Sequence, residues 1–307
     1  MTTLAGDCAL QTSVRVSLPL DLRLSLSALR HGPGDPTIRL DSSGVWRATR
    51  MQSGPATMHL SQRGSEVDVR AWGPGAAEAL DSAPALVGAR DDLGGWNPRA
   101  HPLVHELHRR MEGMRMISSG RVLEAAVPAV IEQKVTSHEA HAAWRRMVMA
   151  WGDPAPGPGE LKLMPSPEML GAQPYWAFHR HGVERRRADV IRSLAARSRR
   201  VEEAAIMPKP QARGRLEAFS GVGPWTSAEV ARVCWGDADA VSVGDYHVGP
   251  VVVYALTGRR GGDDDAMLEL LEPFRPHSAR AANLIMLGGP RPPRRAPKAR
   301  LRDFRQF

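Results

Sequence analysis

Residues 213–258 read RGRLEAFSGVGPWTSAEVARVCWGDADAVSVGDYHVGPVVVYALTG, and this stretch decides the fold. Helical patterns lie on both sides of FSGVGP (219–224), where Gly221 and Gly223 flank one apolar residue, Val222. Glycine tolerates positive φ and lets another backbone approach closely. The stretch therefore predicts two helices joined by a tight turn, with the valine anchored in the core.

The start of the second helix is a candidate anion site. The N–H groups of a first helical turn have no intrahelical partner, and the positive end of the helix dipole lies there. Such groups bind phosphate. The residues expected to contact a DNA phosphate are Ser220, Gly221, Val222, Gly223 and Thr226. A tight turn without a ligand explains these residues equally well, so the assignment depends on the residues that come after the second helix.

A carboxylate follows the second helix. Asp245 lies in GDADAVSVGDYHVGP (236–250), directly before the apolar stretch VVVYAL (251–256). An aspartate in this place is well suited to cap the next helix. Read alone, Asp245 is sufficiently explained by that structural role.

Taken together, these elements resemble the helix–hairpin–helix DNA glycosylase superfamily, and within it most of all the 3-methyladenine DNA glycosylase II branch. The specific part is the order helix, FSGVGPWT, helix, GDADAVSVGDYH, helix over about residues 207–260, with the helix–hairpin–helix motif at about 210–236. A weaker resemblance lies in IEQKV (131–135). The β-rich N-terminal region also fits this branch, which has a small sheet domain before its helices.

The resemblance implies that Asp245 is the catalytic carboxylate. Cleavage of a glycosidic bond passes through an oxocarbenium-like state, and a carboxylate nearby stabilises the positive charge on the sugar. The resemblance also implies that His247 contacts a backbone phosphate. A histidine on a helix face or in a helix cap would look the same in the sequence.

The resemblance also indicates the nucleophile. Family members that cut the DNA backbone carry a lysine two residues after the second glycine of the hairpin, because a Schiff base needs an amine. Trp225 stands at that position, and the four lysines of the chain lie outside the hairpin. We therefore expect a monofunctional enzyme that uses water and has no lyase activity.

Further site residues follow from the same resemblance. The predicted base pocket contains Trp225, Tyr246 and Glu229, although core packing would also explain the tryptophan, and Glu229 stands where relatives can carry an aromatic residue. Gln133 and Lys134 occupy the loop that enters the duplex when a base is flipped out. Lys134 departs from the expected apolar wedge, so contacts with a phosphate or with the orphaned base, or a plain polar helix face, stay open.

Outward from this motif, the chain predicts an α+β fold. Residues 1–90 form a β-rich N-terminal domain, because short alternating runs broken by turn residues predict a small antiparallel sheet with one or two helices. Residues 91–289 have helical spacing and form a mostly α-helical glycosylase domain. Residues 290–307 form a basic tail that we expect to be disordered.

Local patterns give three further expectations. VRVSLPLDLRLSL (14–26) alternates like a strand. Ser137 is the expected N-cap of a long helix. The aspartates at 263–265 follow two glycines and indicate a solvated loop rather than a metal site.

Positive charge is clustered. The formal net charge is +8, from 41 Lys and Arg against 33 Asp and Glu. Residues 179–200 hold eight arginines against two acidic residues, and residues 289–307 hold seven basic residues against one acidic residue. Such clusters favour a polyanionic partner. The preference for arginine over lysine is also typical of a GC-rich genome.

Composition excludes several classes of protein. No apolar run approaches the ~20 residues that span a bilayer, and the N-terminus lacks a signal-peptide pattern. We expect a cytoplasmic protein that associates with the nucleoid when bound to DNA, and no membrane contact. Two cysteines, Cys8 and Cys234, cannot form a four-cysteine metal site. We expect no cofactor and no metal ligated by side chains; the resemblance allows a monovalent cation held by the hairpin carbonyls.

The sequence thus predicts a monomeric, monofunctional DNA glycosylase of base excision repair. Its partner is double-stranded DNA containing a damaged base, with an alkylated purine as the favoured substrate. An 8-oxoguanine-type glycosylase and a non-catalytic helix–hairpin–helix DNA-binding protein are the alternatives.

Overall fold

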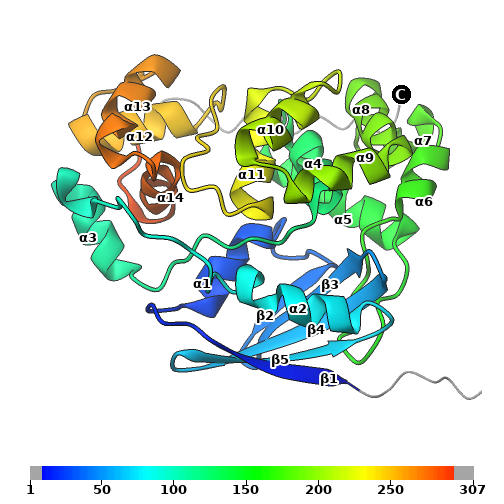
Figure 1. Cartoon of the computed structure of the whole chain (residues 1–307). Coiled ribbons are helices and arrows are strands. Elements are labelled where there is room, and N and C mark those ends of the chain that lie inside the picture. The colour runs from blue at the N-terminus through cyan, green and yellow to red at the C-terminus, as the bar shows by residue number, and fades with distance from the viewer. Residues whose placement is uncertain (1–8, 294–307) are drawn as a thin grey trace, which may run out of the picture.

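One antiparallel sheet lies beneath a larger body of helices in the computed structural model, which describes residues 9–293 (Figure 1). Most of the predicted tail at 290–307 therefore lies outside the described residues. The order across the sheet is β1-β5-β4-β3-β2, and all neighbours are antiparallel. This confirms the predicted α+β fold with a small N-terminal sheet. The strands are β1 (Leu10–Arg15), β2 (Ile38–Asp41), β3 (Gly44–Met51), β4 (Gly54–Arg63) and β5 (Glu66–Trp72).

Alternating apolar residues set the register of the central strands. Met58 and Leu60 of β4 pair with Ala71 and Val69 of β5, and all four are fully buried. Side chains alternate between the faces of a strand, so these pairs cover one face of the sheet. A slip of one residue would turn them outward, which fixes the register.

The strand predicted over residues 14–26 is wrong in its second half. That part forms the short helix α1 (Leu22–Leu26), and the Asp21 carboxylate accepts a hydrogen bond from the Leu24 N–H at 2.9 Å. Leu22 and Leu26 lie four residues apart, and both are buried. This spacing fits a helix as well as a strand, and the capping aspartate favours the helix.

The helices occupy the rest of the chain. α5 is capped by Thr136 rather than by the predicted Ser137: the Thr136 hydroxyl accepts from the Glu139 N–H, and the Glu139 carboxylate accepts from the Thr136 N–H. In the described part of the chain, no helix is both long enough and apolar enough to cross a membrane. After β5 the α-helices are α2 (Ala76–Leu86), α3 (Pro102–Arg110), α4 (Val122–Glu132), α5 (Ser137–Trp151), α6 (Pro167–Ala172), α7 (Tyr175–His179), α8 (Arg185–Ala196), α9 (Ser198–Glu202), α10 (Lys209–Glu217), α11 (Pro224–Cys234), α12 (Val248–Thr257), α13 (Asp264–Leu271) and α14 (Ser278–Gly288).

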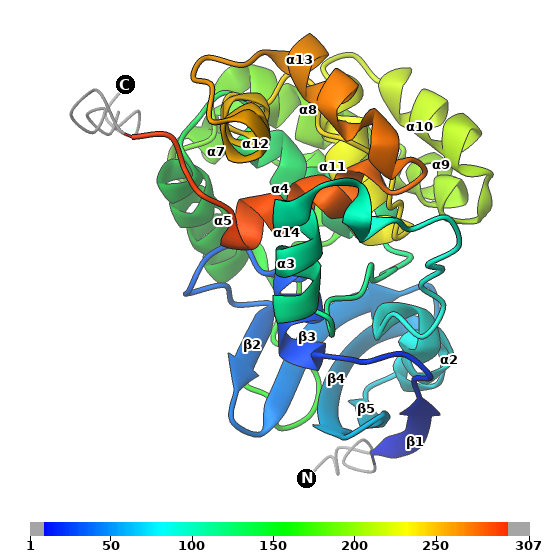
Figure 2. The same ribbon diagram turned by 90° about the vertical axis from the view of Figure 1, so that its left-hand side faces the viewer.

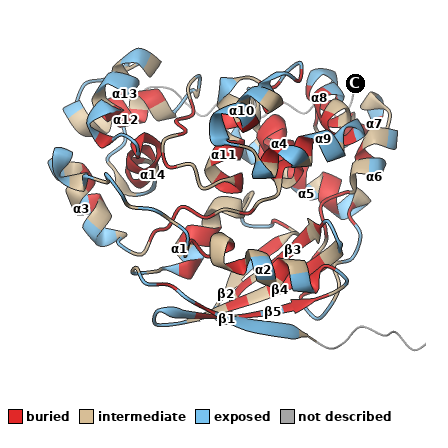
Figure 3. Cartoon of the chain, in the orientation of Figure 1, coloured by how far each residue is buried: buried red, intermediate tan, exposed pale blue. Residues whose placement is uncertain are grey.

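Two large apolar cores organise these elements (Figure 3). The first core joins the inner face of the sheet to α2, α4, α5, α8 and α11. The second core is built by α3, α12, α13 and α14, which lie together in Figure 2. The predicted domain boundary at residue 90 is therefore a change of secondary structure and not a division between cores, because the sheet and several helices share one core.

A buried ion pair ties the second core to the segment that follows α2. Arg280 on α14 donates from Nη1 to Asp91 Oδ2 at 3.0 Å and from Nη2 to Oδ1, and the two side chains are only 2% and 3% exposed. Asp91 also accepts from the Met116 N–H at 3.2 Å and lies 3.8 Å from Arg115 Nη1. One carboxylate thus neutralises two buried guanidinium groups.

We expect Asp91→Ala to lower the free energy of unfolding by about 3–5 kcal/mol, because removing one partner of a buried pair leaves the other charge uncompensated. Urea denaturation measures the change. Asp81→Ala, at an exposed position of α2, is the matched control and should stay within about 0.5 kcal/mol of the parent protein. Equal stability of the two variants would contradict the role given to Asp91.

Candidate functional site

The predicted hairpin joins α10 to α11 between residues 218 and 223. Gly221 has φ +88°, a conformation that residues with a Cβ rarely adopt. Phe219 and Val222 are buried in the first core, as predicted for the apolar residue between the glycines. The Val222 N–H donates to the Phe219 carbonyl oxygen at 3.0 Å and closes the turn.

The two glycines of the hairpin have different surroundings. A Cβ on Gly221 would lie 2.3 Å from Val190 Cγ2, so the hairpin rests directly on α8. Gly223 has an extended backbone, and a Cβ there would meet nothing within 4 Å. The hairpin is therefore packed on one side and open at Gly223, where a ligand backbone can approach.

The N-terminus of α11 provides the expected donors. Pro224 at its first position has no N–H, and the next N–H groups of the first turn have no intrahelical acceptor. Thr226 is only 2% exposed, and its hydroxyl accepts from Gln133. Its contact with a DNA phosphate stays a prediction, and so does that of Ser220, which is exposed.

The Gln133 side chain connects the end of α4 to the hairpin through hydrogen bonds. Its Nε2 donates to the Gly221 carbonyl oxygen and to Thr226 Oγ1, both at 2.9 Å. This amide is engaged within the protein, and the contact of Gln133 with DNA stays a prediction. Lys134 follows it as an exposed residue with φ +55° at the tip of the turn between α4 and α5. Unusual φ values in non-glycine residues are often found at functional sites.

Asp245 is held by three N–H groups. Its Oδ1 accepts from the backbone N–H of His247 at 2.7 Å and of Val248 at 3.0 Å, and its Oδ2 accepts from the indole Nε1 of Trp225 at 2.9 Å. The first two bonds cap α12, which is the structural role that the sequence left open. The third bond joins the carboxylate to α11, and a cap does not need it.

Trp225 and Tyr246 are the aromatic residues of the predicted base pocket. Neither residue lines either of the two cavities described below, so their place in a pocket stays a prediction. Trp225 instead orients the carboxylate of Asp245 through its indole N–H. Tyr246 is 87% exposed, with its ring edge-on to His247 at a centroid distance of 5.0 Å. His247 is also exposed, and its phosphate contact stays a prediction.

Asp264 is a residue that the sequence prediction missed. Its Oδ2 accepts from the Gly244 N–H at 2.7 Å, which ties the loop before Asp245 to α13. Asp263 caps the same helix by accepting from the Ala266 N–H at 3.0 Å. The run at 263–265 is therefore a helix start and not a solvated loop. An aspartate before an apolar periodic stretch is the signal that could have revealed it.

A cavity of about 330 Å³ has walls from α1, α11, α12 and α14, and so from both cores. Val248, whose N–H donates to Asp245, lines this cavity. Leu287 on its rim is 54% exposed, so the cavity reaches the surface. Among the residues that the structure describes, no aromatic side chain lines it.

Glu229 is the residue of the predicted pocket that does line this cavity. Its Oε2 accepts from Arg232 Nη2 at 2.7 Å, and its Oε1 accepts from the Ser242 hydroxyl. Burial alone would raise the pKa of Glu229, but the Arg232 guanidinium and the Ser242 hydroxyl outweigh burial and hold the pKa below its usual value. The carboxylate is therefore ionised at neutral pH.

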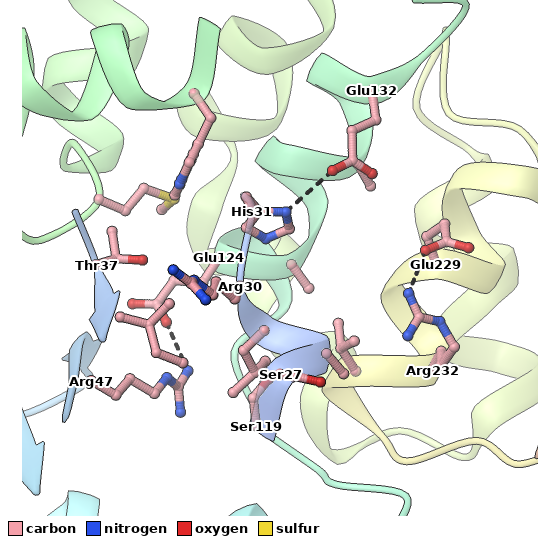
Figure 4. A pocket seen from close by; sticks show the side chains of 18 of the residues that line it. Ser27, Arg30, His31, Thr37, Arg47, Ser119, Glu124, Glu132, Glu229 and Arg232 are labelled. Atoms are coloured by element: carbon pink, nitrogen blue, oxygen red, sulfur yellow. Dashed lines mark hydrogen bonds and ion pairs between the residues drawn. The ribbon is translucent and has the colours of Figure 1, made fainter. Parts of the chain in front are cut away.

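A second cavity of about 270 Å³ lies between the sheet, α4 and α11 (Figure 4). Glu229 and Arg232 line it too and so form a polar wall common to both cavities. Its lining also contains a hydrogen bond between His31 and Glu132 at 3.2 Å and an ion pair between Arg47 and Glu124 at 3.1 Å.

Metal-binding side chains do not gather anywhere in residues 9–293. Cys234 is buried on α11, and burial raises the pKa of its thiol, while Cys8 lies outside the described residues. The Gly221 carbonyl oxygen accepts from Gln133 but has a second lone pair, so a monovalent cation at the hairpin stays a prediction.

The arrangement of a sheet, two apolar cores, a hairpin and an aspartate one helix later is a fold found in solved structures of DNA glycosylases. No protein-family model and no curated protein matches the sequence. Solved structures do match the fold, which confirms the fold that the resemblance implied.

Three of these structures show how similar the matching folds are to this chain. The 3-methyladenine DNA glycosylase from Archaeoglobus fulgidus has a TM-score of 0.75 at 18% identity, covering 90% of this chain and 97% of that chain. An 8-oxoguanine glycosylase/lyase from Clostridium acetobutylicum, bound to DNA with cytosine opposite 8-oxoguanine, has a TM-score of 0.68 at 14% identity. The match covers 92% of this chain and 97% of that chain. The 3-methyladenine DNA glycosylase Mag1 of Schizosaccharomyces pombe, bound to abasic DNA, has a TM-score of 0.52 at 18% identity. The match covers 61% of this chain and 91% of that chain.

The two hairpin glycines give a matched pair of variants. We expect Gly221→Ala to lower the free energy of unfolding by about 1–3 kcal/mol, because alanine strains the backbone at φ +88°. Its new Cβ would also collide with Val190. Gly223→Ala should fold with the stability of the parent, within about 0.5 kcal/mol, because its Cβ points into open space. Thermal and urea unfolding measure both, and a destabilised Gly223→Ala with an unaffected Gly221→Ala would refute this description of the hairpin.

Proposed function

We propose that this protein is a monofunctional DNA glycosylase that hydrolyses the bond between a damaged purine, with alkylated purines favoured, and its deoxyribose. The observation that carries the proposal is the position of Asp245. Its carboxylate is fixed by three N–H groups, contacts the lining of a base-sized cavity through Val248, and is linked through Trp225 to the hairpin helix.

The hairpin supplies the main contacts with the DNA backbone. N–H groups at the start of α11 donate to a backbone phosphate, and the open side of Gly223 admits that backbone. Arg185 and Arg186 are exposed on α8, the helix against which Gly221 packs, and add positive charge to that helix. These contacts position the duplex without reading its sequence.

A base inside a duplex must be turned out before its glycosidic bond is accessible. The flipped base enters the cavity between the two cores, which leaves a gap in the stack. Lys134 is exposed on the turn that Gln133 fastens to the hairpin, so its side chain is in position to enter that gap or to contact a phosphate. The hydrogen bonds of Gln133 hold this turn at a fixed distance from the phosphate-binding hairpin.

The chemistry requires stabilisation of a positively charged sugar. As the glycosidic bond breaks, the deoxyribose acquires oxocarbenium character, and a preorganised carboxylate beside it lowers the barrier. The three N–H donors hold Asp245 in place, so little reorganisation is needed during the reaction. Water then adds to the sugar, which gives the free base and an abasic site.

Trp225 supports water as the nucleophile. An enzyme that cuts the backbone needs an amine that attacks the sugar. The indole at this position donates to Asp245 and has no nucleophilic nitrogen. Two of the described lysines are engaged elsewhere, because Lys162 donates to the Gly152 carbonyl oxygen and Lys209 pairs with Asp237.

Asp245→Asn should reduce release of free base from alkylated duplex DNA by at least ~100-fold, because the neutral amide cannot stabilise the charged sugar. The affinity for the same DNA should change little, since Asp245 is not among the groups that contact the phosphate. Single-turnover assays of base release and a DNA-binding titration measure the two effects. Asp265→Asn, exposed on α13, is the matched control, and equal activity of both variants would exclude Asp245 as the catalytic group.

Trp225→Phe removes one N–H donor from Asp245 and keeps an aromatic ring in place. We expect base release to slow about tenfold, a barrier increase of ~1.4 kcal/mol, with DNA affinity unchanged. Trp176→Phe, at an exposed indole on α7, is the control and should leave the rate unaltered. A rate for Trp225→Phe equal to that of the control would show that the indole does not orient the carboxylate.

A further inference from the structure

One face of α11 carries both the group that holds Asp245 and a second polar group deeper in the molecule. Trp225 and Glu229 are four residues apart and therefore lie on the same side of the helix. Their separation along the helix axis is about 6 Å, from a rise of 1.5 Å per residue. A flat bicyclic base that points its glycosidic bond at Asp245 would extend its far edge towards Glu229.

The polar groups at Glu229 have unused hydrogen-bonding capacity. Each of its carboxylate oxygens accepts one bond, from Arg232 or from Ser242, and each has a further lone pair. Arg232 donates to Glu229 from one of its nitrogens, and its guanidinium has further N–H groups. Both side chains line the cavity that begins at Val248. An ionised acceptor and a charged donor therefore lie side by side in its wall.

The other residues that line this cavity contribute little to distinguishing one base from another. Its apolar lining is aliphatic, with residues such as Met114, Ile117, Val241 and Met286. The described residues place no aromatic face against the base, so stacking on an electron-rich ring is not what selects a cationic purine here. Selection falls to the few polar groups that converge on the base.

We propose that Glu229 and Arg232 read the Watson–Crick edge of the flipped base and select guanine-derived over adenine-derived lesions. Guanine presents two N–H donors, at N1 and at the 2-amino group, which a carboxylate accepts together, and its O6 accepts from the guanidinium. Adenine has an unprotonated N1 and a donor at position 6, so it lacks the paired donors and places an N–H where guanine has an acceptor. This inference rests on the proposed glycosylase activity.

Duplex DNA treated with dimethyl sulfate tests the proposal, because one preparation carries both N7-methylguanine and N3-methyladenine. A second duplex carries 8-oxoguanine, which has the same Watson–Crick edge as guanine. Released bases are separated by chromatography, and their rates are corrected for spontaneous loss. We expect the parent protein to favour at least one guanine-derived base over N3-methyladenine. Glu229→Gln should lower release of that base at least ~10-fold while N3-methyladenine release falls less or not at all.

Matched variants separate recognition from stability. Glu269→Gln is an exposed change of the same type on α13 and should leave the ratio of released bases unchanged. Glu229→Asp keeps the negative charge beside Arg232 but withdraws the carboxylate by one methylene group. It should shift the ratio in the same direction as Glu229→Gln, and it replaces that variant if the amide prevents folding.

The outcomes distinguish this inference from the proposed function. Release of none of the three bases by the parent protein would overturn both. Release of N3-methyladenine in preference to both guanine-derived bases, or a ratio that neither Glu229 variant changes, would overturn the assignment of Glu229 and Arg232 and leave the glycosylase activity standing.

Discussion

The hydrogen bond from the Trp225 indole to the Asp245 carboxylate is the contact on which the site depends. It joins the first turn of α11, which follows the hairpin, to the start of α12, where the carboxylate also accepts from the Val248 N–H. The hairpin helix and the carboxylate are therefore joined directly. In the proposed function, a phosphate bound at the hairpin would fix the place of a sugar relative to Asp245, which is the positioning that glycosidic cleavage requires.

The two cores make that arrangement rigid. The hairpin is packed against α8 through Gly221 and Val190 and is fastened to α4 by Gln133. The second core supplies α12 and α14, and the buried pair of Asp91 and Arg280 holds α14 in place. The cavity proposed to receive the base lies where the two cores meet, so its shape depends on contacts between residues far apart in the sequence.

Local signals in the sequence were enough for the hairpin, for the helix after it and for a small sheet followed by helices, because glycine conformation, helical periodicity and strand alternation act over short distances. They did not reveal the contacts of the residues predicted for the base pocket. Trp225 donates to Asp245, and Tyr246 is largely exposed. Asp264 and the use of the Gln133 amide depend on long-range contacts that no periodic pattern encodes.

The most direct test of the central claim, hydrolytic removal of a base with Asp245 as the charge stabiliser, measures both products of one reaction. The parent protein is incubated with damaged duplex DNA, and free base and strand breaks are measured on the same sample, with and without alkali. We predict free base in amounts equal to alkali-labile abasic sites, with strands that stay intact until alkali is added and no protein trapped on DNA by borohydride. Strand cleavage without alkali, a borohydride-trapped complex, or no free base from any lesion would contradict the account.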